Sequence, residues 1–380
     1  MIDMQDEKLN ADMKRALRGA FAAKNVLDFD DEVDKQVKAL KARIQEDGTV
    51  SLMDVLSQYQ VDFFSKIAFG QTSNFLEERT PTTPWSSNDR LMHWQIFQGI
   101  PVIEAWLCQS WLSMVWRIWR KQTEASEWMK YAINAIQTRE ADIEKSGNVA
   151  GHRNDLLDRY LQARTTHPHL VDDQSLLRLV SSTVSAGFDS TPHTMNSIII
   201  FLCKHPDAYA KLKQEIMEAH QRGNLSEVPK WTEVNKLPYL DAVMKESMRL
   251  YPFLNILLER QVPETGTNIN GHFLPRGTTV GCHSTLVGCN KDFYGANAND
   301  FCPERWFSAN RIPMERSSMV FGSGKRMCIG LHIAELEIKK TIPVIVRDFD
   351  VSDSMAHCEE VTDSPMLDEA CRARSRTDVG

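Results

Sequence analysis

The chain has 380 residues, of which 42% are hydrophobic and 25% are charged, with a formal net charge of -7 at pH 7. These values are typical of an ordinary globular protein with one large or two smaller domains, and the acidic balance gives no sign of nucleic-acid binding. The eight cysteines form no C-x-x-C pair, which argues against a disulfide framework or a structural zinc site and for a reducing compartment. No run of about 18 apolar residues occurs and residues 1–10 are polar, so we expect neither a membrane-spanning segment nor a signal peptide.

Apolar residues at helical spacing predict two helices within residues 5–47 and a longer helix over Ser51–Phe69. Gly48 and Gly70 stand where the second and third of these helices should end, because glycine readily adopts the conformation that closes a helix. Residues 72–88 are rich in Thr, Pro and Ser, which predicts a loop.

Residues 89–122 contain an unusual concentration of tryptophan, namely Trp94, Trp106, Trp111, Trp116 and Trp119. The simpler interpretation is a buried helical pair whose aromatic side chains supply apolar area. The alternative is a greasy substrate entrance that touches a membrane surface, where Trp is enriched. A polar helix is expected over residues 124–145, followed by a break at residues 146–154 that contains Gly and Asn.

Two helices are predicted within residues 155–204. The second runs from Asp173 to Lys204, and its roughly 30 residues would span about 45 Å, enough to cross a whole domain. In its middle lies the segment Ala186-Gly187-Phe188-Asp189-Ser190-Thr191-Pro192. Small residues there would let a flat cofactor come close. Pro192 has no N–H for the carbonyl of Phe188, so a kink or local opening is expected.

A helix over residues 206–223 and another over Leu237–Tyr251 come next. Glu246 and Arg249 are three residues apart on the second, so they share one face and can pair, although a surface pair of this kind contributes only about 0.2–0.5 kcal/mol. From residue 253 to 295 the pattern becomes short and strand-like with glycine punctuation, and residues 271–278 are interpreted as a hairpin.

Glycine stands at three of the ten residues Phe321–Gly330, around the single Cys328. Because glycine tolerates positive φ and has no Cβ, such a loop can turn tightly and press its backbone against a flat ligand. N–H groups directed at the sulfur of Cys328 would stabilise the thiolate, which is the form that binds metal. A helical pattern follows Gly330, and the partial positive charge of that helix terminus would act in the same direction.

Two other interpretations of this loop are weaker. A lone cysteine in an apolar context is usually buried and inert, but the ten-residue frame argues against that here. A nucleotide phosphate loop needs Gly five residues before its second Gly and Ser or Thr after its Lys. Those positions hold Met319 and Arg326.

The frame Phe321–Gly330 resembles the haem-binding loop of the cytochromes P450: it has the aromatic residue, the glycines (Gly322, Gly324, Gly330), the Arg two residues before the Cys and the Gly two after it. The resemblance implies that Cys328 is the axial ligand of the haem iron, that Arg326 pairs with a haem propionate, and that Phe321 shields the sulfur from water. A thiolate in this position would favour O–O cleavage.

The same resemblance assigns roles elsewhere. On the long helix it makes Asp189 the acid, Ser190 the hydroxyl at the usual Thr position and Thr191 the adjacent hydroxyl of a proton relay, with Ala186 and Gly187 beside the cofactor. Without the haem loop, Asp189-Ser190-Thr191 would be interpreted as a helix cap. A serine lacks the methyl group of threonine, so its side chain is less restricted to one rotamer. This difference concerns how efficiently electron use is coupled to product formation.

Further residues match the family by position. The stretch Phe301–Phe307 resembles the family's Pro-Glu-Arg-Phe segment, so Arg305 is expected to join Glu246 and Arg249 in a buried structural triad. Arg260 matches an Arg that reaches a propionate, the alternative being a solvated strand residue. Near the start, Lys14 or Arg15 would contact a propionate, with Asn10 at a neighbouring aligned position.

We therefore expect a mainly α protein with a small β region, having the cytochrome P450 fold with a long central helix that crosses the haem. The resemblance covers about residues 5–350 and is strongest to filamentous-fungal enzymes of the pisatin-demethylase type. A single domain over residues 1–380 is expected, divided into the helix-rich part 5–252, strands and loops 253–310, the haem loop and following helix 318–345, and a divergent tail 351–380. Both ends depart from the family, which predicts an N-terminally truncated chain and a C-terminal tail unlike the family's final sheet.

The expected function is a haem-thiolate monooxygenase, an oxidoreductase that inserts one oxygen atom from O₂ into an apolar small molecule, in fungal secondary metabolism. The alternatives are a truncated, non-catalytic haem-binding remnant and a reductase-independent isomerase or dehydratase of the same fold. The expected cofactor is haem b, iron protoporphyrin IX. Electrons would come from NADPH through a separate NADPH-cytochrome reductase.

By resemblance the protein would be associated with the cytosolic side of the endoplasmic reticulum, or cytosolic, since this chain shows no anchor. Contact with a membrane surface is compatible with the sequence. The basic residues Lys325, Arg326, Lys339 and Lys340 are expected to form one docking face for an acidic reductase. On that hypothesis Lys339→Glu with Lys340→Glu would slow reduction.

Overall fold

The computed structural model describes residues 6–82, 127–146, 155–353 and 371–375. The tryptophan-rich segment 89–122 and the break at 147–154 lie outside these residues. The described chain is mainly helical with a few small sheets, which confirms the predicted fold class. It packs as two compact units, residues 1–240 together with 329–380, and residues 241–328. The single-domain assignment stays a prediction.

The first unit contains most of the helices: α1 (Glu7–Phe21), α2 (Ala23–Val26), α3 (Asp30–Asp47), α4 (Leu52–Phe69), α5 (Phe75–Glu78), α9 (Glu127–Ser146), α10 (Leu156–Thr166), α11 (Asp173–Lys204), α12 (Pro206–Gln221), α13 (Trp231–Val234) and α18 (Leu331–Asp348), with a 3₁₀ turn η1 (Leu27–Phe29). None of the helices in the described ranges has the length and hydropathy needed to cross a bilayer.

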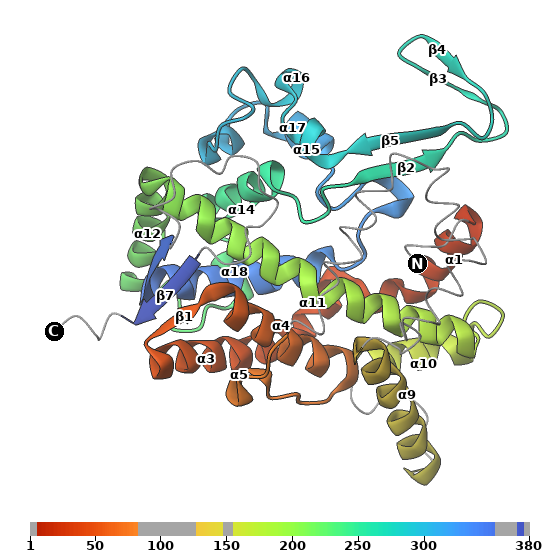
Figure 1. Cartoon of the computed structure of the whole chain (residues 1–380), viewed down its shortest axis with the longest axis horizontal. Helices are drawn as coiled ribbons and strands as arrows, with labels where there is room; N and C mark the ends of the chain where they lie inside the picture. Colours follow the sequence, from red (N-terminus) through yellow and green to blue (C-terminus); the bar gives the residue numbers. More distant parts are fainter. Residues whose placement is uncertain (1–5, 83–126, 147–154, 354–370, 376–380) are drawn as a thin grey trace, which may run out of the picture. The chain divides into compact units, whose positions relative to one another are not determined.

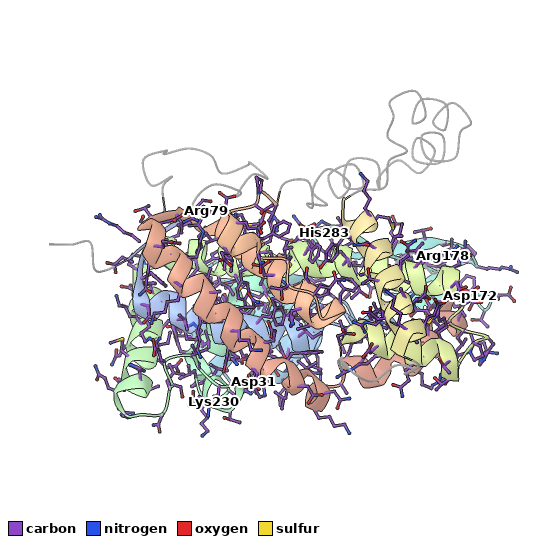
Figure 2. The ribbon with its side chains drawn as sticks, turned by 90° about the horizontal axis from the view of Figure 1, so that it is seen from below. Asp31, Arg79, Asp172, Arg178, Lys230 and His283 are labelled. Atoms are coloured by element: carbon purple, nitrogen blue, oxygen red, sulfur yellow. The ribbon has the colours of Figure 1, made fainter. Side chains whose placement is uncertain are left out.

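The long helix α11 has the predicted bounds. Asp172, labelled in Figure 2, caps its start by accepting a hydrogen bond from the N–H of Ser175 at 2.8 Å. His205 ends it just before Pro206. Figure 1 shows α11 as one continuous helix, and it packs most extensively against α4, with further contacts to α9, α10 and α18. The helix is not interrupted at Pro192, so the predicted local opening there is wrong.

The helix α4 is also close to its prediction. Ser51 is the N-cap residue and Gly70 the C-cap residue, with φ of 64° in the left-handed region that glycine favours. Its side chains are buried on nearly every side, including the polar Gln58, Gln60, Asp62 and Ser65. A helix that is buried all round is a core element, so α4 supports α11 from the interior of the unit.

The first unit has one sheet of three strands, β1 (Thr49–Ser51), β6 (Phe349–Asp353) and β7 (Cys371–Ser375). β7 is the central strand and is antiparallel to both neighbours, with Ala373 opposite Val50 and Val351. Residues 371–375 of the tail thus form a strand, and the prediction that the tail differs from the family's final sheet stays a prediction. Small residues alternate with arginine along β7, and alternation of this kind is typical of a half-buried strand. The segment lacks the β-branched residues that usually predict a strand from the sequence.

The second unit contains four strands, β2 (Leu257–Gln261), β3 (Thr267–Ile269), β4 (His272–Leu274) and β5 (Thr279–His283), and the short helices α15 (Ser284–Gly288), α16 (Lys291–Tyr294), α17 (Arg311–Ser317), η3 (Pro303–Phe307) and η4 (Gly324–Arg326). The helix α14 (Pro238–Leu250) lies mostly in this unit, since the boundary falls after Leu240. β2 and β5 pair antiparallel, and the β3–β4 hairpin continues their ribbon (Figure 1).

The hairpin turn differs from the prediction. Asn270 and Gly271 form it, with φ of 50° and 84°, and the strands lie at 267–269 and 272–274. Two successive positive φ values define the hairpin turn for which Asn-Gly is favoured. The predicted hairpin at residues 271–278 therefore contains one strand of the true hairpin and the return toward β5. The Asn-Gly pair was the signal that would have placed the turn.

Candidate functional site

The loop before Cys328 is closed by its own backbone. The N–H of Cys328 donates to the carbonyl of Phe321 at 2.7 Å, and the N–H of Met327 donates to that of Gly324 at 3.2 Å. Gly322 and Gly324 have φ of 69° and 62°, a conformation that side chains with a Cβ rarely adopt. Gly322 and Gly324 are thus required by the turns of the predicted haem loop, whereas Gly330 has a φ of -85° that other residues also adopt.

The end of this loop presents the thiol. Cys328 is outside any disulfide and its side chain is exposed. Arg326 and Phe321 are half-buried, and Lys325 is exposed. An exposed thiol on a tight glycine loop fits a metal ligand that a flat cofactor approaches from outside, so the residues fit a haem. Arg260 is exposed on β2 and donates to the carbonyl of Glu259 at 2.6 Å; its propionate role stays a prediction.

The predicted relay residues lie in the middle of α11. Asp189 and Thr191 are buried, whereas Ser190 is partly exposed and Ala186 is exposed. The hydroxyl of Ser190 donates to the carbonyl of Ala186 at 2.8 Å. This back-bonding is a common alternative for Ser within a helix. Ser190 must therefore exchange that bond for an outward one in order to act in proton transfer.

Gly187 has a packing reason for being small in addition to its predicted place beside the cofactor. A Cβ at this position would lie 2.3–2.6 Å from the ring of Phe64, on α4. The ring of Phe64 also meets that of Phe188 edge-on, with centroids 5.6 Å apart. The side of Gly187 that a Cβ would occupy faces a neighbouring helix of the same unit. Of the two small residues assigned to cofactor approach, only Ala186 is exposed.

This contact predicts the effect of alanine at two helical glycines. Gly187→Ala is expected to destabilise the chain by about 1–3 kcal/mol, because the added methyl group would displace the Phe64 ring in a packed core. Gly19→Ala on α1 should stabilise it by up to about 1 kcal/mol, since nothing lies within 4 Å of the new Cβ and alanine is the better helix former. Urea denaturation of both variants measures the difference. Equal effects would contradict the assigned Phe64 contact.

The residues of the predicted triad meet in the second unit. Glu246, on α14, is fully buried and accepts hydrogen bonds from Arg249 (Nε at 2.9 Å, Nη2 at 2.7 Å) and from Arg305 (Nε at 2.9 Å). Its carboxylate also accepts from the indole N–H of Trp306 at 3.0 Å and the backbone N–H of Cys302 at 2.8 Å. The contribution of Trp306 was missed, although its sequence position beside Arg305 placed it within reach.

The two arginines use their other donors to fix the loop after α15. Arg249 donates to the carbonyls of Gly288, Ala298 and Asp300. Arg305 donates to those of Tyr294, Asn297 and Asp300. Gly288 is needed here, because a Cβ would lie 2.4 Å from the carbonyl oxygen of Arg249. The triad thereby ties the carbonyls of residues 288–300, a stretch of short turns around α16, to α14 and η3, which supports the structural role predicted for it.

The residues expected near a propionate at the N-terminal end lie on α1. Lys14 is half-buried, and the aligned Asn10 is buried. Arg15 is exposed and pairs with Asp12 one turn away at 2.8 Å. Lys14 or Arg15 therefore stays the predicted cation for a propionate at this position.

The predicted docking face is wrong for two of its four residues. Lys340 is fully buried, and its ammonium group pairs with Asp30 and Asp34 of α3 and donates to the carbonyl of Asp30 at 2.9 Å. Lys339 is also buried, with its ammonium group over the ring of Trp231. Alternating charges on a helix usually mark a solvated face, but here α3 supplies carboxylates that neutralise the buried cation.

Lys340→Met is therefore expected to lower the free energy of unfolding by about 1–3 kcal/mol, because Asp30 and Asp34 would lose their shared cation. The matched control is Lys35→Met on α3, whose exposed pair with Glu32 should matter by less than about 0.5 kcal/mol. Chemical denaturation compares them. If both variants unfold like the parent chain, Lys340 does not hold α18 to α3.

One buried acid was not predicted. Glu337, on α18, is 1% exposed and lies within hydrogen-bonding reach of Gln60, and burial raises its pKa well above the ordinary value. Gln60 in turn donates to the carbonyl of Gly187 at 2.9 Å. The sequence shows Glu337 only as one charge in an alternating helix, so its burial required the structure.

Comparison with known proteins agrees with this geometry. Residues 8–372 match the family model described as Cytochrome P450. A cytochrome P450 monooxygenase of Aspergillus terreus is 30% identical over 360 residues, which cover 92% of this chain and 72% of that protein. The cytochrome P450 monooxygenase cicH of Emericella nidulans is 29% identical over 358 residues, 91% of this chain and 70% of that protein. Pisatin demethylase of Fusarium vanettenii is 29% identical over 357 residues, 92% of this chain and 68% of that protein.

The chain belongs to the cytochrome P450 family. The relatives named above are fungal enzymes, as predicted, and the family match reaches residue 372, beyond the expected limit near residue 350. The family uses haem, and the chain is a haem-thiolate monooxygenase, an oxidoreductase. These matches favour monooxygenation over the non-catalytic remnant and the isomerase considered from the sequence.

Proposed function

We propose that this chain binds haem b through Cys328 and hydroxylates or otherwise oxygenates an apolar small molecule of fungal secondary metabolism. The observation that carries the proposal is the Phe321–Cys328 loop, in which a backbone hydrogen bond and two left-handed glycines present an exposed thiol. Haem, when bound, supplies the chemistry that activates O₂.

Each protein group then has a definite task. Cys328 provides the thiolate that binds the iron, and the closed loop keeps its sulfur in one orientation. Arg326 and Arg260, with Lys14, provide cations for the haem propionates. Phe321, half-buried at the other end of the loop hydrogen bond, limits access of water to the sulfur. The glycines at 322, 324 and 330 let the backbone approach the ring closely.

Proton transfer is assigned to α11. Asp189 is the buried acid, and Ser190 and Thr191 are hydroxyl groups that can hold and pass a proton in a hydrogen-bonded chain. Because Ser190 donates its proton to the carbonyl of Ala186, its oxygen can accept a hydrogen bond, but it must rotate in order to donate one elsewhere. A Ser190→Thr variant would keep the hydroxyl and restrict its rotamer, so it tests whether this position limits coupling of electron use to product.

Electrons are supplied by a separate reductase that oxidises NADPH, and the chain works at the cytosolic surface of the endoplasmic reticulum. With Lys339 and Lys340 buried, the basic residues of the haem loop that remain for docking are Lys325 and Arg326. Lys325 is exposed, so an acidic partner surface can reach it. The substrate class rests on the fungal relatives, among them one named pisatin demethylase.

The test is the absorbance difference spectrum of the expressed chain, reduced with dithionite, with and without carbon monoxide. A red-shifted Soret band typical of a thiolate–iron–carbonyl complex is expected, and its appearance would justify screening apolar substrates. Absence of haem, or a band typical of a neutral proximal ligand, would overturn the proposal.

A further inference from the structure

The carbonyl groups of residues 186–190 on α11 have unusual hydrogen bonds. Side chains on α11 itself add a donor to three of them: Ser190 to the carbonyl of Ala186, His193 to that of Asp189, and Thr194 to that of Ser190, at 2.7–2.8 Å. Pro192 has no N–H to give to the carbonyl of Phe188. The carbonyl of Gly187 receives its extra donor from a different helix, because Gln60 of α4 donates to it at 2.9 Å.

The orientation of the Gln60 amide follows from this contact. A carbonyl oxygen only accepts hydrogen bonds, so the NH₂ group of Gln60 must face Gly187 and its oxygen must face away. Gln60 is fully buried, and among the described residues its Oε1 has no hydrogen-bond partner. A buried amide oxygen without a partner is costly and calls for a donor nearby.

Glu337 is the group beside it. It reaches Gln60 from α18, and its own Oε1 likewise has no partner among the described residues. An ionised carboxylate is an acceptor only, so it would leave the oxygen of Gln60 unsatisfied, whereas a protonated carboxyl has an O–H to donate. Burial also favours the neutral acid. The two lysines that follow along α18 have other partners: the ammonium group of Lys339 lies over the ring of Trp231, and that of Lys340 pairs with carboxylates of α3.

We propose that Gln60 is a positioning residue that ties the α11 segment 186–190 to α18, with a neutral Glu337 as the anchor at its far end. In this chain of bonds Glu337 donates to the oxygen of Gln60, and the NH₂ group of Gln60 donates to the carbonyl of Gly187. Phe64, one helical turn after Gln60, packs against the other side of Gly187. α4 therefore holds this glycine by one polar and one apolar contact.

The consequence concerns the residues that follow. Asp189 and Ser190 lie in the same segment, two and three residues after the Gly187 carbonyl that Gln60 contacts, and close to Pro192, which removes one hydrogen bond of the helix. The catalytic value of the link rests on the function proposed above, but the link itself is a property of the first unit. It can be tested on the purified chain without relying on haem or turnover.

The first test is infrared spectroscopy at neutral pH. The difference between the parent chain and Glu337→Gln should contain the carbonyl stretch of one neutral carboxylic acid. Gln60→Met should move that band to higher frequency, because the O–H loses its acceptor. The control is Gln58→Met, since Gln58 is another buried glutamine of α4 but donates to the carbonyl of Thr80. Loss of a carboxylate band instead of a neutral-acid band would overturn the proposal.

The second test is hydrogen exchange of the α11 backbone. Gln60→Met should speed exchange of the amides at residues 187–191 roughly tenfold, the factor that corresponds to one net hydrogen bond. Glu337→Gln should leave exchange near the parent rate, because its NH₂ group still donates, and Glu337→Met should not. An unchanged rate in Gln60→Met, or an equal change in Gln58→Met, would refute the link. If Gln60→Met fails to fold, Gln60→Asn withdraws the amide by one methylene and serves in its place.

Discussion

Cys328→Ser is expected to abolish the red-shifted Soret band of the reduced carbon monoxide complex. A serine hydroxyl stays protonated at neutral pH and cannot replace the thiolate that gives the band its position. The side chain of Cys328 is exposed, and the loop is closed by the backbone N–H of residue 328, which serine retains. The fold should therefore survive, with a change in the free energy of unfolding of less than about 0.5 kcal/mol.

The matched control is Cys282→Ser. Cys282 lies on β5 in the same unit and is also outside any disulfide, but it is not part of the loop. This variant should keep the full band. Two spectra and two denaturation curves decide the matter: a persistent red-shifted band in Cys328→Ser would mean that another residue ligates the iron, and a band lost in both variants would point to general damage.

Glu246→Ala is expected to lower the free energy of unfolding by about 3–5 kcal/mol, the cost of leaving buried charges without their partner. The substitution removes the common acceptor of Arg249, Arg305, Trp306 and the backbone N–H of Cys302. Because the arginines hold the carbonyls of residues 288–300, that loop should become susceptible to proteolysis before the rest of the chain. Urea denaturation and limited proteolysis with mass spectrometry measure the two effects.

Glu218→Ala on α12 is the control for this prediction. Glu218 also pairs with an arginine, Arg222, but both side chains are exposed. Exposed pairs of this kind contribute about 0–1 kcal/mol. Should the two alanine variants prove equally stable, the buried position of Glu246 would not have the importance assigned to it here.

The elements that the sequence predicted best are those with local signals at both ends. Asp172 before α11 and His205-Pro206 after it determine the bounds of that helix, and Gly70 determines the end of α4. Glu246 and Arg249 were predicted to be buried because of their place in a family motif; their spacing alone would have suggested a weak surface pair. In both cases the information lies within a few residues along the chain.

The features that the sequence did not reveal depend on partners far along the chain. Lys340 is buried because Asp30 and Asp34 lie opposite it, about 300 residues away in sequence. Glu337 is buried against Gln60, and Gly187 is small because of Phe64. The alternating charges on α18 are compatible with a solvated face or with buried, paired groups. The small residues on α11 are compatible with a nearby cofactor or with a closely packed helix. Only the packing of α3, α4, α11 and α18 shows the buried pairs and the helix contact.

The strand order in the sheet of the first unit affects when this sheet can form during synthesis. Its middle strand, β7, occupies residues 371–375, whereas β1 occupies residues 49–51. During synthesis β1 and β6 cannot pair through β7 until those late residues have left the ribosome, and contacts this distant in sequence form slowly. A chain stopped before residue 371 would leave both strand edges open to other chains. We infer that this sheet forms late, once β7 has been made.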